Sequence, residues 1–148
     1  MALGLNTIRT ALETRLQTYL NSGSRPTTVY AYPPDSPSFP SIGIVPGEGD
    51  FITYYETMSD SGISSVRLVI RLYLSARFID AQMAIDDYLS AGSGFTSSIL
   101  NAILADKTLG TTVDTCIIRE VRGVSFDEMT GQWTVDIPIE IFARKVAA

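Results

Sequence analysis

The sequence predicts an α+β domain: a mixed, mainly antiparallel β-sheet with an N-terminal helix and a central two-helix unit packed on one face. Three segments support this prediction. Apolar residues recur at spacings of three and four over residues 3–20, as in an amphipathic helix. Residues 65–75 alternate as a half-buried strand does. Residues 115–144 contain two long β-prone runs around a turn-rich segment, which predicts a terminal hairpin.

The first helix is predicted from a single apolar stripe. The Asn-Ser-Gly-Ser sequence at 21–24 predicts its end, and Pro26 prevents its extension. A lone helix of this length is marginal in water, so we expect the stripe to dock on a sheet or on another chain. Its residues are Leu5, Ile8, Leu12, Leu16, Tyr19 and Leu20.

Two short strands are predicted next, at residues 28–32 and 41–45. The four prolines within residues 33–40 predict a stiff loop between them, because proline cannot donate to a β-ladder. A proline motif read by an aromatic groove is the alternative interpretation. Residues 46–50 predict a turn, since its two glycines are not followed by the third glycine or the Lys-Ser/Thr pair of phosphate-binding loops.

Residues 51–56 are predicted to form a strand that leads, through the turn formers at 58–62, into the strand at 65–75. In the strand at 65–75, the free energy gained by burying one face is offset by the entropy cost of ordering the backbone. This strand therefore needs neighbouring strands on both edges. We therefore expect it to be central in the sheet. Its predicted core face consists of Val66, Leu68, Ile70, Leu72 and Leu74.

Two helices are predicted to follow this strand. The first covers residues 76–90 and ends at the Ala-Gly-Ser-Gly segment 91–94. Thr96 or Ser97 is the predicted N-cap of the second, which runs through Asp106. The predicted inner face of the first helix consists of Phe78, Ile79, Met83, Ile85, Tyr88 and Leu89, and that of the second of Ile99, Leu100, Ile103 and Leu104.

The terminal hairpin is predicted from antiparallel strands at 115–126 and 132–144. Pro138 lacks an N–H, so an edge position or a bulge is expected there. The earlier strand has apolar residues on both faces, which a partner subunit or a bulge that swaps the faces explains equally well. The predicted inner face of the last strand consists of Trp133, Val135, Ile137, Ile139 and Ile141.

Composition excludes several kinds of protein. The chain has no histidine and one cysteine, so it contains no Ser-His or Cys-His pair, no zinc finger and no intrachain disulfide. The net charge is −5, and the sequence contains no run of basic residues. Both features argue against sequence-specific nucleic-acid binding. With no signal-like leader and no run of about 20 apolar residues, we expect a soluble chain, folded in a cytoplasm and not in a membrane. We expect no cofactor, no metal and no catalytic activity.

Two carboxylates, Asp136 and Glu140, share one face of the last predicted strand. A glycosidase-like dyad is one interpretation, but ion pairing with strand arginines is favoured because no sugar platform accompanies the pair. Cys116 is predicted to be a small core residue. The candidate arginine partners are Arg67, Arg71, Arg119 and Arg122.

Two sets of residues are hypothesised to form subunit or partner interfaces. Phe51, Tyr54 and Tyr55 supply the aromatic side chains that are frequent at interface cores, although they could equally fold back onto their own domain. The second set is predicted on the sheet face away from the helices, making charged contacts within or between subunits, with a solvated face as the alternative. Its members are Arg67, Arg71, Asp136 and Glu140.

The order of these elements resembles that of the tail terminator, or tail completion, proteins of long-tailed bacteriophages (siphoviruses). Two segments carry the resemblance: Leu-Ser-Ala-Gly-Ser-Gly-Phe at 89–95 with the helix that begins near residue 97, and the turn Met-Thr-Gly-Gln-Trp at 129–133. It spans nearly the whole chain and implies one tail-terminator-like domain, residues 1–148.

The resemblance implies a structural virion protein that forms a homohexameric ring. Such a ring caps the tail tube, ends its polymerisation and provides the head–tail joining surface. The implied partners are further copies of the chain, the tail tube protein and a head–tail connector or neck protein, with DNA passing through the lumen. The implied location is the head-proximal end of the tail, after assembly in the host cytoplasm. A neck or head-completion protein is the alternative, followed by a small carboxylate-dependent enzyme or ligand-binding domain.

Overall fold

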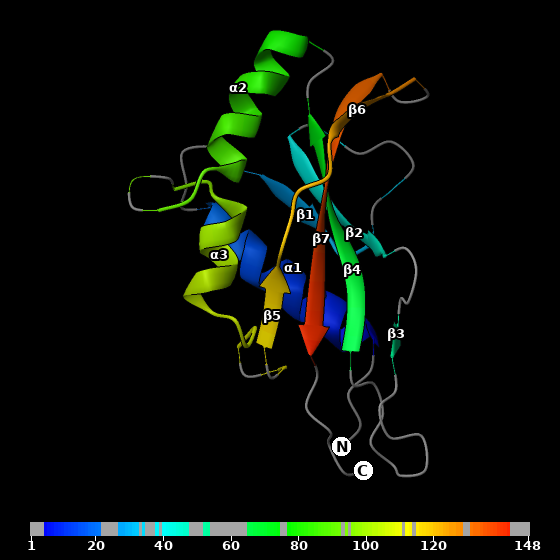
Figure 1. Cartoon of the computed structure of the whole chain (residues 1–148), viewed down its shortest axis with the longest axis vertical. Coiled ribbons are helices and arrows are strands. Elements are labelled where there is room, and N and C mark those ends of the chain that lie inside the picture. The colour runs from blue at the N-terminus through cyan, green and yellow to red at the C-terminus, as the bar shows by residue number, and fades with distance from the viewer. Residues whose placement is uncertain are drawn as a thin grey trace.

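The fold consists of one curled β-sheet and the helices packed against it (Figure 1). The computed structural model describes residues 5–21, 27–32, 34, 38, 40–47, 52–53, 65–74, 77–92, 94, 96–110, 112–113, 115–128 and 131–142. The helices are α1 (Leu5–Asn21), α2 (Phe78–Leu89) and α3 (Ile99–Ala105). The strands are β1 (Thr28–Tyr30), β2 (Ser41–Pro46), β3 (Ile52–Thr53), β4 (Ser65–Leu74), β5 (Thr115–Ile118), β6 (Val124–Asp127) and β7 (Gln132–Phe142).

The strand order is β1-β2-β4-β7-β5, with β3 also paired to β4 and β6 also paired to β7. Only β1 and β2 are parallel among the described pairs. β4 lies between β2 and β7, which confirms its predicted central position. The α+β class with a mixed, mainly antiparallel sheet is likewise confirmed.

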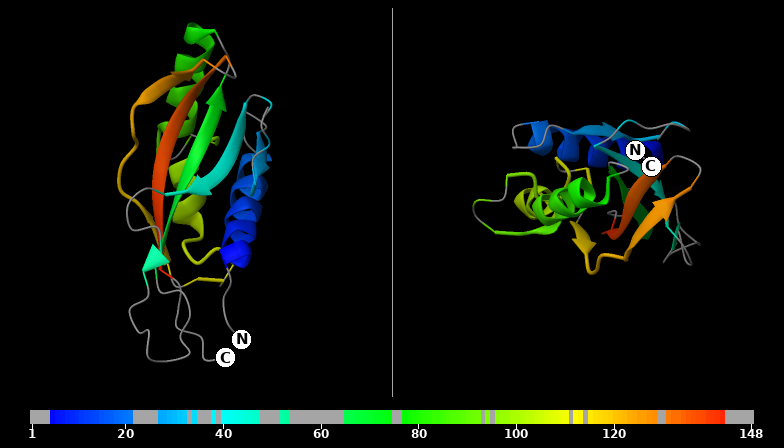
Figure 2. Two further views of the ribbon diagram at one scale, coloured as in Figure 1. Left: turned by 90° about the vertical axis from the view of Figure 1, so that its right-hand side faces the viewer. Right: turned by 90° about the horizontal axis from the view of Figure 1, so that it is seen from above.

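The core lies between the helices and one face of the sheet (Figure 2). α1 contributes the predicted stripe, with Leu5 and Tyr19 only partly buried. β4 and β7 contribute alternate residues, as period-two burial of one sheet face requires. The members of the core cluster from these elements are Ile8, Leu12, Leu16, Leu20, Val66, Leu68, Ile70, Leu72, Leu74, Val135, Ile137, Ile139 and Ile141.

The predicted inner face of α2 is wrong in part. Its buried residues are Ala81, Ala84 and Tyr88, whereas Phe78, Ile79 and Met83 are more than half exposed. At 100° per residue Ile79 and Met83 share the side opposite the alanines. The small side chains of Ala81 and Ala84 let the helix approach the core closely. Because Ile79 and Met83 lie on the opposite side, the helix has apolar residues on both sides.

The predicted N-cap of α3 is also wrong by one or two positions. Ser98, rather than Thr96 or Ser97, caps the helix, and its Oγ accepts a hydrogen bond from the Asn101 N–H at 3.1 Å. The Asn101 side chain in turn bonds both backbone groups of Gly92, at 3.1 and 2.8 Å. These bonds fix the loop between the two helices. On α3, Ile99, Ala102 and Ile103 are buried, whereas Leu104 is exposed.

The predicted strand at 115–126 is interrupted. Ile118 of β5 pairs with Ile139, and Val124 of β6 pairs with Val135. Three β7 residues, 136–138, therefore face five residues, 119–123, that leave the ladder. This interruption, rather than one continuous strand, separates the two apolar stretches.

β7 is paired on both sides over most of its length, but at Pro138 the partner on the β5–β6 side has left the ladder, so the expected edge position or bulge is present as a local interruption. The Asp136 carbonyl accepts from the Arg122 N–H at 2.8 Å, which shows that its backbone polar groups point toward the interrupted side. Because backbone direction alternates along a strand, the nitrogen of Pro138 points the same way. The missing N–H therefore faces the interruption, where no ladder bond is lost.

Gly47 extends the β2–β4 pairing beyond the end of β2. Its N–H donates to the Arg67 carbonyl at 2.9 Å. A Cβ at this position would lie 2.5 Å from that same oxygen, closer than side chains approach backbone atoms. This glycine is thus explained by a close backbone approach, and the rest of the predicted turn at 48–50 lies outside the described residues.

Asp106 organises the loop between α3 and β5. Its carboxylate accepts from the Thr108 hydroxyl at 2.8 Å and N–H at 3.3 Å, and from the Gly110 N–H at 2.9 Å. These bonds, the Thr108 hydroxyl first, lower the pKa of Asp106. They also hold Leu109 in its left-handed conformation, with φ of 52°.

The lowered pKa predicts an acid-sensitive contribution to stability. A carboxyl group whose folded pKa is depressed stabilises the protein above its unfolded pKa, about 3.9, and this contribution is lost as pH falls through the folded pKa. Asp106→Asn is therefore expected to be less stable than wild type at pH 7, with the difference shrinking below about pH 4. Urea unfolding across this pH range measures the difference. A stability difference that stayed constant with pH would contradict the lowered pKa of Asp106. Thr108→Val, which removes one of the hydrogen bonds to Asp106, should reproduce part of the stability loss.

Candidate interaction surface

The sheet face away from the helices brings four predicted charged residues together. Arg67 and Arg71 belong to β4, and Asp136 and Glu140 belong to β7. The register places Arg67 directly opposite Glu140, and Arg71 directly opposite Asp136. The predicted gathering of these side chains on one face is therefore present, and their contacts lie within one chain.

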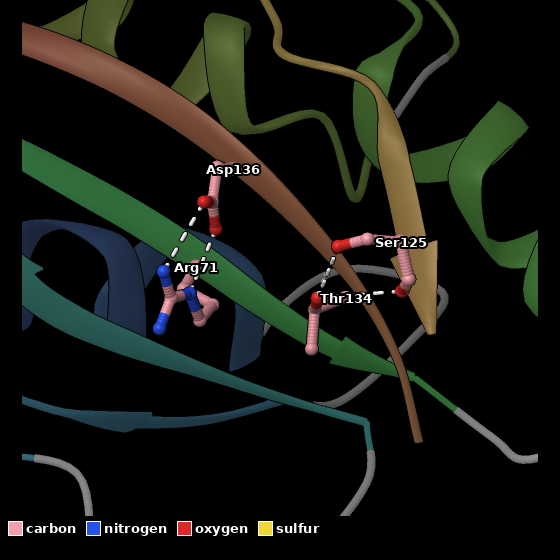
Figure 3. A network of polar contacts seen from close by, with 4 residues as sticks. All are labelled: Arg71, Ser125, Thr134 and Asp136. Atoms are coloured by element: carbon pink, nitrogen blue, oxygen red, sulfur yellow. Dashed lines mark hydrogen bonds and ion pairs between the residues drawn. The ribbon is translucent and has the colours of Figure 1, made fainter. Parts of the chain in front are cut away.

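Arg71 and Asp136 form a forked ion pair (Figure 3). Nε donates to Oδ1 at 2.7 Å and Nη2 donates to Oδ2 at 3.2 Å. The hydrogen bond to Asp136 raises the pKa of Arg71. Since the side chains remain 38% and 27% exposed, solvent screens the pair.

Glu140 accepts from two arginines. Arg119 Nη1 lies 2.8 Å from Oε1, and Arg67 Nε lies 3.5 Å from Oε2. The Ser65 hydroxyl adds a longer bond of 3.4 Å. The Glu140 side chain is only 14% exposed. The two arginines and the hydroxyl therefore replace much of the hydration of its carboxylate.

This geometry favours ion pairing over the glycosidase-like dyad. Asp136 and Glu140 are four residues apart on one strand, which separates their backbones by about 13 Å. Glycosidase carboxyl pairs lie about 5–9.5 Å apart. Each carboxylate is also turned toward its own arginine.

The Arg71–Asp136 pair should contribute a measurable but modest coupling energy. A double-mutant cycle with Arg71→Ala and Asp136→Ala is expected to give about 0.5–1 kcal/mol at low salt, because the pair is forked and partly buried. High salt should reduce this value. The Arg77–Asp80 pair, at 3.6 Å and with side chains 76% and 47% exposed, is the matched control and should give nearly zero. Equal couplings for both pairs would contradict this prediction.

A pocket of about 200 Å³ opens on the same face, between the interrupted segment and β4. Its lining includes Arg67, Arg119, Arg122 and two glutamates, together with Gly47 and Pro138. Elsewhere along β7, Ser125 and Thr134 link β6 to β7 through their hydroxyls, 3.1 Å apart (Figure 3). The carboxylates of β7 on this face are thus paired with arginines of the same chain.

An exposed aromatic cluster, here called the aromatic edge, was not predicted. Phe78 of α2 and Phe126 of β6 both contact Trp133 of β7, with ring centroids 4.7 and 5.2 Å from the Trp133 ring. Phe78 and Phe126 are 53% and 45% exposed, and Val124 beside them is 43% exposed. The only signal in the sequence was the apolar character of both faces of the segment 115–126.

Cys116 has the predicted core position. It is buried, and its thiol donates to the Lys107 carbonyl at 3.2 Å. Burial raises the pKa of this thiol to about 11. The thiol is therefore protonated at neutral pH and is a poor nucleophile.

Two kinds of feature are absent from the described residues. Within that part of the chain, no group of three or more Cys, Asp or Glu side chains is arranged to hold a metal ion. None of its helices has the length and apolar character needed to cross a membrane. The predicted interface residues Phe51, Tyr54 and Tyr55 lie outside the described residues.

No protein-family model matches the chain, and no curated protein sequence matches it significantly. The fold is α+β, and its surface has both charged and apolar areas.

Proposed function

We propose that this chain is a structural subunit of a bacteriophage tail, which forms a ring on the tail tube, ends tube polymerisation and provides the head–tail joining surface. The order of elements supports the proposal. It consists of an N-terminal helix, a central strand leading to a two-helix unit and a terminal hairpin, the order on which the resemblance to tail terminators was based.

The observation that carries the proposal is the presence of unlike apolar surfaces on different elements. Ile79 and Met83, 61% and 57% exposed, project from the outer side of α2. Tyr32, 62% exposed, follows β1 at one edge of the sheet, and the Arg9 guanidinium lies 4.8 Å from its ring centre. A ring is built from head-to-tail contacts, in which one patch meets a different patch on the next subunit. Within the described residues, the pair Ile79 and Met83 and the side chain of Tyr32 are two unlike candidates for such patches, in addition to the aromatic edge.

The proposal is tested by the mass of the chain in solution, with and without assembled tail tubes, followed by electron microscopy of the tube ends. Rings at the head-proximal end of tubes are the expected result. Rings at the head portal without tube binding would favour a connector or neck protein instead. A chain that never forms rings in either setting would overturn the proposal.

The hypothesised aromatic interface gives a separate prediction for the ring. Replacing Tyr54 and Tyr55 by serine is expected to abolish or strongly reduce the ring mass in native mass spectrometry, because aromatic residues dominate interface energetics. Thr10→Ser, on the exposed side of α1, is the control and should leave ring mass unchanged. Unchanged ring mass in the tyrosine variant, with its fold verified by urea unfolding, would remove these residues from the interface.

A further inference from the structure

The pocket on the outer sheet face lies where the partner of β7 leaves the ladder. One row of side chains across β4, β7 and β5 consists of Arg67, Glu140 and Ile117. In the next row on this face, Val69 lies opposite Pro138, and continuous pairing of β5 would place Arg119 beside Pro138. Because Arg119 has left the ladder, the third place of that row is open, and the residues around it line the pocket.

Two arginines of this pocket share one carboxylate. Arg119 contacts Glu140 through Nη1 at 2.8 Å, and Arg67 contacts it through Nε at 3.5 Å. A guanidinium has several N–H donors in a planar fork. Within the described part of the chain, the side chains of Arg67 and Arg119 make no further hydrogen bond or ion pair. They are 48% and 63% exposed, so their remaining donors are accessible to a ligand.

The charge of the lining favours an anion. Its ionised side chains are three arginines and two glutamates, so one positive charge is left unbalanced, although the whole chain has a net charge of −5. Arg122 adds to this positive charge but already interacts within the chain. Arg67 and Arg119 are therefore the groups whose donors would hold the anion.

We propose that this pocket binds a small organic monocarboxylate with a short hydrocarbon body. A carboxylate matches the fork of a guanidinium, and its single charge matches the unbalanced positive charge of the lining. Val69, Ile117 and Pro138 give the hydrocarbon apolar contacts. The pocket volume of about 200 Å³ lies below the roughly 300–1,000 Å³ of sites for drug-sized ligands, so the ligand is small.

Titration of the purified, isotope-labelled chain with hexanoate at neutral pH tests the proposal by NMR, whether or not the chain also forms rings. Saturable shifts are expected for the backbone amides of Gly47, Ile117 and Arg119, which line the pocket. Acetate should bind more weakly, because it lacks the hydrocarbon. Hexylammonium and chloride, at equal ionic strength, are the controls and should give no saturable shift at these amides.

Three outcomes of this titration would contradict the proposal. No saturable shift with hexanoate would mean that the pocket is not a carboxylate site. Equal shifts with hexylammonium or chloride would mean that the arginines do not select a carboxylate. Equal affinity for acetate and hexanoate would remove the hydrocarbon body from the proposed ligand.

Two substitutions with opposite expected effects separate ligand binding from a purely structural role of the ion pairs. Glu140→Gln removes the carboxylate that competes for both arginines, so it should tighten hexanoate binding several-fold. Arg119→Gln removes a charged donor and should weaken binding roughly tenfold or more, and Arg67→Gln should act in the same direction. Arg77→Gln is the matched control, because Arg77 pairs with Asp80 away from the pocket.

Urea unfolding of each variant verifies that it is folded before its affinity is compared. Weaker or unchanged binding in folded Glu140→Gln would show that Glu140 does not compete with the ligand, and would overturn the proposal. Arginine variants that bind hexanoate as tightly as Arg77→Gln would overturn it as well.

Discussion

Leu68→Ala is expected to lower the free energy of unfolding by about 2–5 kcal/mol. Leu68 is fully buried in β4, the strand with neighbours on both sides, and it lies opposite Ile139 of β7. Its loss removes apolar burial and leaves a cavity between the sheet and the helices, where close packing limits relaxation. Urea unfolding of wild type and variant, with the slope checked for constancy, measures the change.

The matched control is the neighbouring residue on the opposite face. Arg67 has a side chain 48% exposed and lies 3.5 Å from Glu140, so Arg67→Ala should cost less than about 1 kcal/mol. The two substitutions differ by one position along the same strand. Similar losses for both would mean that the sheet has no dominant core face, against the burial pattern described above.

The parts of the fold that sequence predicted well are those in which one long segment has one buried side. The stripe of α1 and the alternation of β4 each repeat over several turns or strand residues, so burial of the core face determines their pattern, although Val69 and Tyr73 on the opposite face of β4 are buried too. The pairing of Arg71 with Asp136 follows from the same logic. Charged residues on the outer faces of two adjacent strands meet once those strands pair.

Prediction failed where packing between distant segments decides the outcome. α2 approaches the core through Ala81 and Ala84, and its larger apolar residues Ile79 and Met83 are left outside. Periodicity cannot distinguish these two sides, because both are apolar. Only the close fit of the helix on its neighbours does so.

The interrupted edge shows the same limitation. Pro138 was recognised as unable to donate, but the partner strand, rather than β7, accommodates it by leaving the ladder. The aromatic edge combines one ring from each of α2, β6 and β7. No local pattern in the sequence brings these three rings together, because their proximity depends on the register of the hairpin and the position of the helix.

The buried Arg9 has the second largest expected effect. It lies on the helix stripe beside Ile8, is only 8% exposed, and was not singled out by the apolar pattern. Its Nη1 donates to the carbonyls of Ala31 at 3.0 Å and Ile44 at 3.1 Å. One guanidinium thus ties α1 to β2 and to the segment after β1.

Arg9→Leu is expected to lower the free energy of unfolding by about 2–4 kcal/mol, because it leaves two carbonyls without this charged donor. Arg15 of the same helix is the matched control: its Nε donates to a single carbonyl, that of Ala102, at 2.8 Å. Arg15→Leu should therefore cost about half as much. Arg9→Lys, which keeps the charge but not the planar guanidinium, should fall between wild type and Arg9→Leu. If urea unfolding found Arg9→Leu as stable as wild type, hydrophobic docking of α1 alone would suffice to hold the helix on the sheet.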